Sequence, residues 1–227
     1  MYGTRLRDTG DMAGKKFIQH APGILLGRLP FSIANILCQL RVLTRIKALL
    51  LSERNLELCQ TFSDLLWKLE YDILNHHDPP DTLAESHTNP FGSKLMIDAV
   101  GIAALLFSYS HLRDLAAPIL YDRLSARLRS TLSALPGPHV SSGVGVESLA
   151  QIYAHKFLGG DELSVLLWLL NLGLQGSRSD QQGKEWFSST MAQICWNNGI
   201  LSRALVNERI RNVVPQVTQE TDVSEEA

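Results

Sequence analysis

Two adjacent histidines followed by an aspartate come closest, by residue type, to a metal or proton-transfer site. They are His76, His77 and Asp78. Metal ligands on one helix are spaced three or four residues apart, so adjacent histidines point to different faces and would need distant partners. Imidazoles are also favourable near the negative end of a helix dipole. We therefore interpret this group as a solvated helix end, and we assign no metal site.

The patterns for other bases, nucleophiles and cofactors are incomplete. His155 with Tyr153 and Lys156 is more typical of a helix surface than of a proton relay. The segment SSGVGVES (141–148) lacks a preceding strand and a third glycine, so it predicts a turn and no dinucleotide site. We assign no catalytic residue and no cofactor. An enzyme with a site assembled from distant residues is kept as an alternative, and its candidates would be His76, His77, Asp78 and His155.

Three cysteines are scattered through the chain. They are Cys38, Cys59 and Cys195. An odd number at wide spacing forms neither a disulfide framework nor a Cys-x-x-Cys metal site. We predict buried free thiols in a reducing compartment.

Tryptophans offer the best candidate for a ligand-binding site. Trp67 and Trp168 lie within apolar stripes and are predicted to be core residues. Trp186 and Trp196 are ten residues apart, about three helical turns, so one helix face could hold both. We hypothesise an effector pocket with aromatic walls between helices at 163–174 and 182–196. Its residues would be Trp168, Trp186 and Trp196.

The elements that must position such residues belong to one folded unit. The chain has 227 residues, 45% of them hydrophobic and 19% charged, which is enough for one sizeable core. The net charge of −2 predicts no general attraction to nucleic acid or to an anionic membrane. Residues 1–47 nevertheless hold eight Lys and Arg. A basic arm that contacts DNA phosphates is one interpretation, and an ordinary solvated terminus is the one we favour.

The apolar periodicity predicts helices throughout. Apolar residues recur at spacings of three and four, and no period-two alternation indicates a strand. Ser32 and Ser52 are predicted N-caps of the first two helices, and Asp161 is the predicted N-cap of a later one. Further helices are expected at about 93–114, 120–135, 147–158, 161–174, 182–196 and 198–213.

These elements predict an all-α fold of about seven or eight helices, packed as one irregular or solenoid-like domain without a sheet. The domain is expected to cover 31–214, between a flexible basic arm at 1–30 and a disordered acidic tail at 215–227. The longest apolar run, 95–109, has 15 residues and contains Asp98. A helix that crosses lipid needs about 20 residues, so we predict no membrane span.

Three segments, taken in order, form a pattern. AALLFSYSHLRDLAAPILYDRLSARLRSTLSAL (103–135) joins an aliphatic-aromatic helix end through a proline turn to a Leu/Arg helix. LSVLLWLLNLGLQGS (163–177) is a Leu-Leu-Trp helix with a glycine turn, and KEWFSSTMAQICWNNGI (184–200) is an amphipathic helix that starts near Trp-Phe. Together they resemble the C-terminal regulatory region of fungal zinc-cluster transcription factors.

This resemblance implies an arrangement in space. The run 163–174 would be a core helix, Gly173 and Gly176 would form its exit, and Trp186-Phe187 would start a helix folded back on the same core. The resemblance covers roughly 36–213. It implies a nuclear, non-enzymatic transcription-regulator-like domain that acts through protein contacts or a small effector. A cytoplasmic location is the alternative.

The chain departs from the family in its cysteines. The family's DNA reader holds two zinc ions with six cysteines, and three scattered cysteines cannot build it. We therefore expect no sequence-specific DNA binding by this chain alone. The glycine pair of the family is also broken, as Gly173-Leu174, and its closing motif is missing after Val214.

A free-standing helical adaptor or dimerisation protein is the alternative from a different class. Leu-rich faces such as 120–135 would then pair with another chain and form a buried interface.

Overall fold

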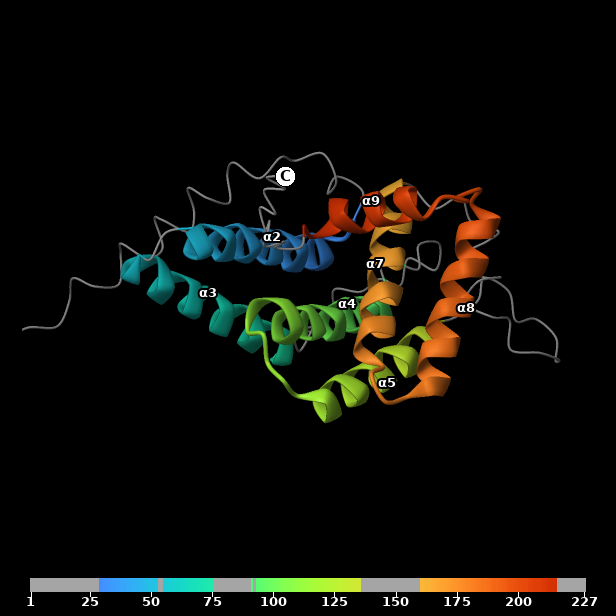
Figure 1. Cartoon of the computed structure of the whole chain (residues 1–227), viewed down its shortest axis with the longest axis horizontal. Coiled ribbons are helices and arrows are strands. Elements are labelled where there is room, and N and C mark those ends of the chain that lie inside the picture. The colour runs from blue at the N-terminus through green and yellow to red at the C-terminus, as the bar shows by residue number, and fades with distance from the viewer. Residues whose placement is uncertain (1–28, 53–54, 76–90, 92, 136–159, 216–227) are drawn as a thin grey trace, which may run out of the picture.

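The computed structural model describes residues 29–52, 55–75, 91, 93–135 and 160–215. Within these ranges the fold is all-α, as predicted, with seven α-helices, one π-helical segment and no strand (Figure 1). The helices are α2 (Phe31–Ser52), α3 (Leu56–Leu74), α4 (Lys94–Phe107), α5 (Pro118–Ser133), α7 (Gly160–Gly176), α8 (Gln181–Asn197) and α9 (Arg203–Val213), and the π-helical segment is η2 (Ser108–Leu112).

Several sequence predictions fall outside the described residues. They are residues 1–28 of the arm, 216–227 of the tail, the helix at 147–158, and the sites at His76, His77, Asp78 and His155.

α7 is the central helix of the fold. It packs against α4, α5, α8 and α9, and Figure 1 shows α8 running beside it. Its residues from Leu163 to Leu170 are all buried. A helix that is apolar all round has to be enclosed by other elements. The apolar run 163–174 is therefore a core helix, as the resemblance implied.

α4 is the second buried helix, and it contacts α2, α5 and α7. Between Met96 and Phe107 only Asp98 is exposed. By length and composition alone, the segment Lys94–Leu112 is apolar enough to cross a membrane, and 72% of that apolar window is buried inside the fold. A buried core helix meets the same criteria, so one such helix is weak support for a membrane span.

The leucine-rich face of α5 packs inside the chain. Leu128, Leu132 and Leu135 are buried, and α5 contacts α4, α7 and α8. The prediction that the face 120–135 pairs with another chain is therefore wrong for these three leucines. They are already covered by the chain's own helices.

Capping contacts correct several predicted helix boundaries. Ser32 and Ser52, both predicted caps, lie inside α2, and the side chain of Asn55 caps α3. Asp161 lies in the first turn of α7 instead of preceding it. Ser202 caps α9, so the final helix is shorter than predicted. Serine, asparagine and aspartate are all good N-caps, so residue type does not choose between neighbouring candidates.

In a solenoid each unit contacts only its neighbours, whereas α2 and α9, the first and last described helices, are joined directly. The helices therefore form an irregular bundle. Arg41 of α2 donates from Nε to the Val213 carbonyl at 2.7 Å and from Nη2 to the Asn212 carbonyl. These contacts satisfy a buried guanidinium at the negative end of α9.

Candidate functional site

The three tryptophans of the predicted effector pocket lie in three different environments. Trp168 is 2% exposed and packs against Phe107 in the core, with 6.3 Å between the ring centroids. Trp186 is half-buried with its ring edge-on to Phe187, whereas Trp196 is 75% exposed. The described structure gives these indoles no shared wall, and a pocket formed by all three stays a prediction.

Trp67 was predicted to be a core residue, and that prediction is wrong because the side chain is 64% exposed. A neighbouring face of α3 packs into the core instead, where Leu66 and Leu69 are buried. The Arg113 guanidinium lies over the Trp67 ring, 4.7 Å from its centroid. Arg113 also donates two hydrogen bonds of 2.9 Å to the buried carboxylate of Glu70. A cation held in this way covers part of the exposed indole.

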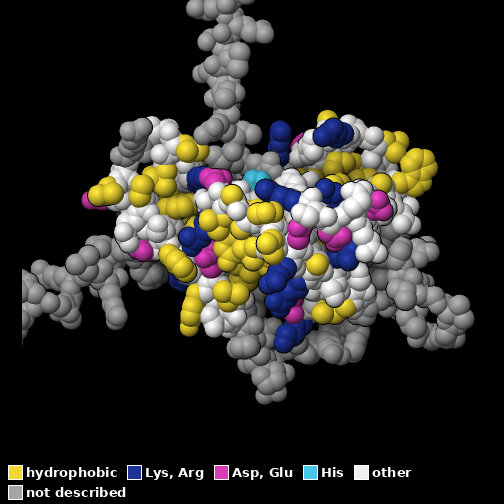
Figure 2. Space-filling model, turned by 60° about the horizontal axis from the view of Figure 1, so that its bottom comes forward, with side chains coloured by type: hydrophobic (Ala, Val, Ile, Leu, Met, Phe, Trp, Pro, Cys, Tyr) yellow, Lys and Arg dark blue, Asp and Glu magenta, His cyan; other side chains and the backbone are white. Residues whose placement is uncertain are grey.

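Exposed apolar side chains occur on α3, on the segment that leads into α5 and in the first turn of α5, and we call this surface the α3–α5 face. Its residues are Trp67, Tyr71, Leu74, Leu115, Ile119 and Leu120. Figure 2 shows hydrophobic side chains in the middle of this side of the molecule, with charged side chains around them. Apolar surface of this kind is typical of contact sites.

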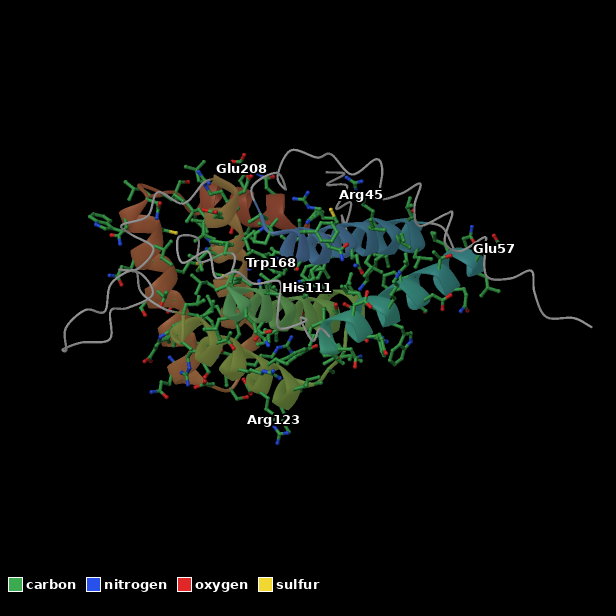
Figure 3. The ribbon with its side chains drawn as sticks, turned by 180° about the vertical axis from the view of Figure 1, so that it is seen from behind. Arg45, Glu57, His111, Arg123, Trp168 and Glu208 are labelled. Carbon is green, nitrogen blue, oxygen red and sulfur yellow. The ribbon has the colours of Figure 1, made fainter. Side chains whose placement is uncertain are left out.

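A cavity of about 320 Å³ lies between the π-helical end of α4, the start of α5 and the end of α7. It is lined by Leu106, Ser110, His111, Tyr121, Leu172, Gln175, Gly176 and Arg178. This volume is at the low end of the range for sites that bind small molecules. Such sites also combine apolar walls with a few polar groups. Figure 3 shows His111 in the middle of the molecule near Trp168, and Phe107 contacts both rings.

The cavity lies where α4 continues as a π-helix. The Arg113 N–H donates to the Ser108 carbonyl at 2.8 Å, and the Leu115 N–H donates to the Tyr109 carbonyl at 2.9 Å. Asp114 has a φ of 49°, a left-handed conformation that aspartate tolerates better than most residues. π-helical turns are rare, and they frequently occur at functional sites.

Lys47 of α2 holds this helix end in place. Its Nζ donates to the His111 carbonyl and to the Asp114 carboxylate, each at 2.5 Å. A positive charge is favourable at the C-terminal end of a helix. Among the basic residues of 1–47, Arg41 and Lys47 thus have structural partners, while Arg45 is exposed. This removes two cations from the DNA-phosphate interpretation of that region.

The contacts of His111 determine its protonation state. Ser110 Oγ donates to the Leu106 carbonyl at 2.6 Å and also lies 2.6 Å from His111 Nδ1. Because a hydroxyl has only one proton, Nδ1 is the donor in the second contact. Burial lowers the pKa of His111, Lys47 lowers it further, and Asp114 opposes these effects. The imidazole is therefore neutral at neutral pH, and no residue in the described ranges donates to its Nε2.

Arg178 supplies the positive charge of the cavity. Its guanidinium lies over the Tyr121 ring, 4.6 Å from the centroid. The Tyr121 hydroxyl donates to the Leu115 carbonyl, which holds the ring. No carboxylate in the described part of the chain forms an ion pair with Arg178. Asp122, next to Tyr121, accepts the Ser179 N–H at 3.0 Å instead, and this hydrogen bond lowers the pKa of its carboxyl.

A buried pair of serines holds the end of α7 beside the cavity. Ser125 Oγ and Ser177 Oγ lie 2.5 and 2.9 Å from the Gly173 carbonyl and 2.7 Å from each other. Two hydroxyl protons serve these three contacts, so two of them are hydrogen bonds at any time. The network ties α5 to the last turn of α7.

α8 folds back on α7 at Gly173. Phe187 is fully buried, and a Cβ added at Gly173 would lie 2.2 Å from Phe187 Cε1. The helices can therefore approach this closely only because residue 173 has no side chain. The fold-back agrees with the arrangement that the resemblance implied, although Trp186-Phe187 lie inside α8 and not at its start.

The cysteines and acidic residues do not form a metal centre within the described ranges, where no group of three or more His, Cys, Asp or Glu could hold an ion. Cys195 is buried, as predicted, and Cys38 is half-buried. Burial raises the pKa of both thiols, against opposing charges from Arg209 and Arg41 respectively. Cys59 is exposed on α3, so the prediction of burial is wrong there.

The polar residues of the cavity were missed by the reasoning from sequence. Ser110 and His111 are far along the chain from Gln175 and Arg178, and only the fold brings them to one cavity. One signal was present. The apolar run of α4 ends abruptly in the polar segment SYSHLRD (108–114), and this marks a helix end with side chains able to bind.

The chain was compared with models of protein families, with curated proteins and with solved structures, and none matched.

Proposed function

We propose that this chain is a non-enzymatic regulatory domain, related to the C-terminal regulatory region of fungal zinc-cluster transcription factors. It acts in the nucleus through protein contacts or a small effector, and it does not read a DNA sequence by itself. The observation that carries the proposal is the packing of the three resembling segments against one another.

Those segments coincide with particular helices. Residues 103–135 cover the end of α4, η2 and α5, whereas 163–177 fall on α7 and 184–200 on α8. α4 packs against α5, α5 against α7, and α7 against α8. A regulatory domain of this kind requires its characteristic segments to share one core, so this packing supports the resemblance.

The state of the cavity residues favours binding over catalysis. Ser110 gives its proton to the Leu106 carbonyl and accepts one from His111 Nδ1. A base that activates a serine has to accept the serine's proton. His111 therefore does not activate Ser110, and the cavity fits an effector better than a substrate.

A helical adaptor is the second candidate, and the α3–α5 face favours it. Trp67, Tyr71 and Leu74 follow one another at helical spacing on the outer side of α3, and all three are exposed. Large aromatic side chains are enriched at the energetic centres of protein interfaces. In this candidate the contact surface lies on α3 and not on the leucines of α5.

The first test is a tethering experiment. The full chain is fused to an unrelated DNA-binding domain in a fungal strain that carries a matching reporter gene. We expect the fusion to change reporter transcription several-fold relative to the DNA-binding domain alone. An inert fusion would overturn the regulatory proposal.

Two matched double variants separate the candidates. One is Trp67→Ser with Tyr71→Ser, on the α3–α5 face, and the control is Trp196→Ser with Leu201→Ser, which are exposed elsewhere. If the regulatory effect depends on contacts made by this face, only the first variant loses it. The adaptor is favoured by a different pair of results. In that case the fusion does not change transcription, but sedimentation shows that the chain self-associates and that only the first double variant abolishes this association.

A further inference from the structure

We propose that the cavity at the π-helical end of α4 binds a small organic carboxylate with an apolar body and a hydroxyl group. Its anionic group would pair with Arg178, and its body would lie against Leu106 and Leu172. This inference rests on the proposed function, because it names the chemical class of the effector.

The volume sets the size of the ligand. The cavity has a volume of about 320 Å³, at the low end of the range for small-molecule sites. The space therefore suits a compact molecule, such as one with a single ring. Larger ligands would have to extend from the mouth into solvent.

The positive charge of Arg178 favours a ligand with a single carboxylate. The Arg178 guanidinium is held over the Tyr121 ring and forms no ion pair with a described carboxylate, since the nearby Asp122 carboxylate accepts backbone N–H groups at 178–180. A guanidinium and a carboxylate form two parallel hydrogen bonds. A phosphate group would carry more charge and is usually surrounded by several donors, whereas Arg178 is the one cation among the lining residues.

The remaining polar groups favour a ligand that also donates a hydrogen bond. His111 Nδ1 is used by Ser110, so Nε2 is left as an acceptor in the neutral ring. Gln175 supplies an amide that can both donate and accept. Leu106, Leu172 and the Tyr121 ring form apolar walls. A hydroxyl on the ligand would satisfy Nε2 without disturbing the contacts of Ser110.

A ligand in this position would touch three helices at once. Leu106 and His111 belong to α4 and η2, Tyr121 to α5, and Leu172 to α7. Binding would therefore stabilise the arrangement of these helices relative to states in which they separate. This is how a small molecule could act as an effector of a helical domain.

The test is titration of the purified full chain with matched probes, by calorimetry and by heteronuclear NMR. The probes are para- and meta-hydroxybenzoate, benzoate, the neutral para-hydroxybenzamide, and inorganic phosphate. The hydroxybenzoates are compact molecules with a single ring, in keeping with the volume of the cavity. We expect saturable binding of a hydroxybenzoate, at least about tenfold tighter than binding of the amide, with shifts of backbone signals at 108–112 and 175–178.

Two variants locate the site and a third tests the hydroxyl contact. Arg178→Gln should weaken carboxylate binding about tenfold or more and leave the amide unchanged. Arg123→Gln is the matched control, because Arg123 is an exposed arginine of α5 that points away from the molecule in Figure 3. His111→Phe should remove the preference for hydroxybenzoate over benzoate.

Several results would overturn the proposal. They are the absence of saturable binding by any carboxylate probe, equal binding by wild type and Arg178→Gln, and tighter binding of phosphate than of the carboxylates. Because these measurements use the isolated chain, they are independent of the reporter experiment. Carboxylate binding with an inert fusion would refute the regulatory role alone, and an active fusion without binding would refute this inference alone.

Discussion

His111 is held as a neutral imidazole by contacts from several elements. Its ring stacks on Phe107 with 4.8 Å between centroids and 7° between planes. Nδ1 donates to Ser110, and Lys47 of α2 binds the backbone carbonyl of His111. The positive charge of Lys47 and the burial of the ring both disfavour a second positive charge, whereas Asp114 favours it. At the scale of the residue, therefore, the fold opposes protonation.

This environment predicts a pH dependence of stability. The folded-state pKa of His111 lies below the ordinary value of 6.5, so the unfolded chain binds this proton more readily. Neutral His111 therefore makes its full contribution to stability at pH values above the unfolded-state pKa. This contribution is lost as the pH falls from the unfolded-state pKa toward the lower folded-state pKa. The measurement is the urea midpoint at about pH 7.5 and about pH 5.5.

The control for this prediction is His111→Phe, which keeps a ring for stacking on Phe107 and removes the titrating group. The variant should show a smaller loss of stability on acidification than the wild type. An identical pH dependence in both proteins would show that protonation of His111 does not contribute.

At the scale of the elements, the contact between α7 and α8 depends on a missing side chain. An added Cβ at Gly173 would lie 2.2, 2.3 and 2.8 Å from three carbons of the Phe187 ring. Phe187 is fully buried, so the ring cannot swing out into solvent without disturbing the core. The serine contacts to the Gly173 carbonyl hold the backbone of α7 at the same point.

We predict that Gly173→Ala lowers the free energy of unfolding by about 1–2 kcal/mol. The usual cost of overpacking a core, about 1–3 kcal/mol, is reduced by the gain of about 0.5–1 kcal/mol that alanine brings in a helix. Urea denaturation measures the change. Gly160→Ala is the control, since the nearest atom to a Cβ there is 3.9 Å away.

The mechanism is checked by a double-mutant cycle with Phe187→Leu. If the ring is the obstacle, Gly173→Ala should cost less, or even stabilise, when leucine replaces the phenylalanine. Additive effects of the two substitutions would contradict a direct clash between residue 173 and the ring.

At the scale of the whole molecule, Arg41 connects α2 to α9, the first and last described helices. Its side chain is buried and binds the carbonyls of Asn212 and Val213, at the end of α9. Burial lowers the pKa of this guanidinium, partly opposed by nearby Cys38 and Asp161, with Arg45 adding to the lowering. The bond closes the bundle around α7.

We predict that Arg41→Met lowers the free energy of unfolding by about 1–3 kcal/mol, because hydrogen bonds to a charged group are lost while the alkyl packing is kept. Arg45→Met, at an exposed position one turn along α2, should change it by less than about 0.5 kcal/mol. Hydrogen exchange at the amides of α9 should also accelerate in Arg41→Met alone. Equal exchange in both variants would mean that Arg41 does not hold α9.

The sequence by itself determined the fold class and the position of most helices. Apolar residues at spacings of three and four are a local property, so α4, α5, α7 and α8 could be placed to within a few residues. The resemblance also implied that the run 163–174 is a core helix, and the structure buries Leu163 to Leu170 in α7.

Only the tertiary structure decided which of several apolar faces is buried and which polar side chains meet. α3 has apolar residues on two sides, and the core covers Leu66 and Leu69 while Trp67 stays exposed. The cavity joins His111 to Arg178, which are distant in the chain. Contacts of this kind between distant side chains depend on how whole helices pack around α7. Side-chain spacing within one helix carries no information about the neighbour that the helix will contact.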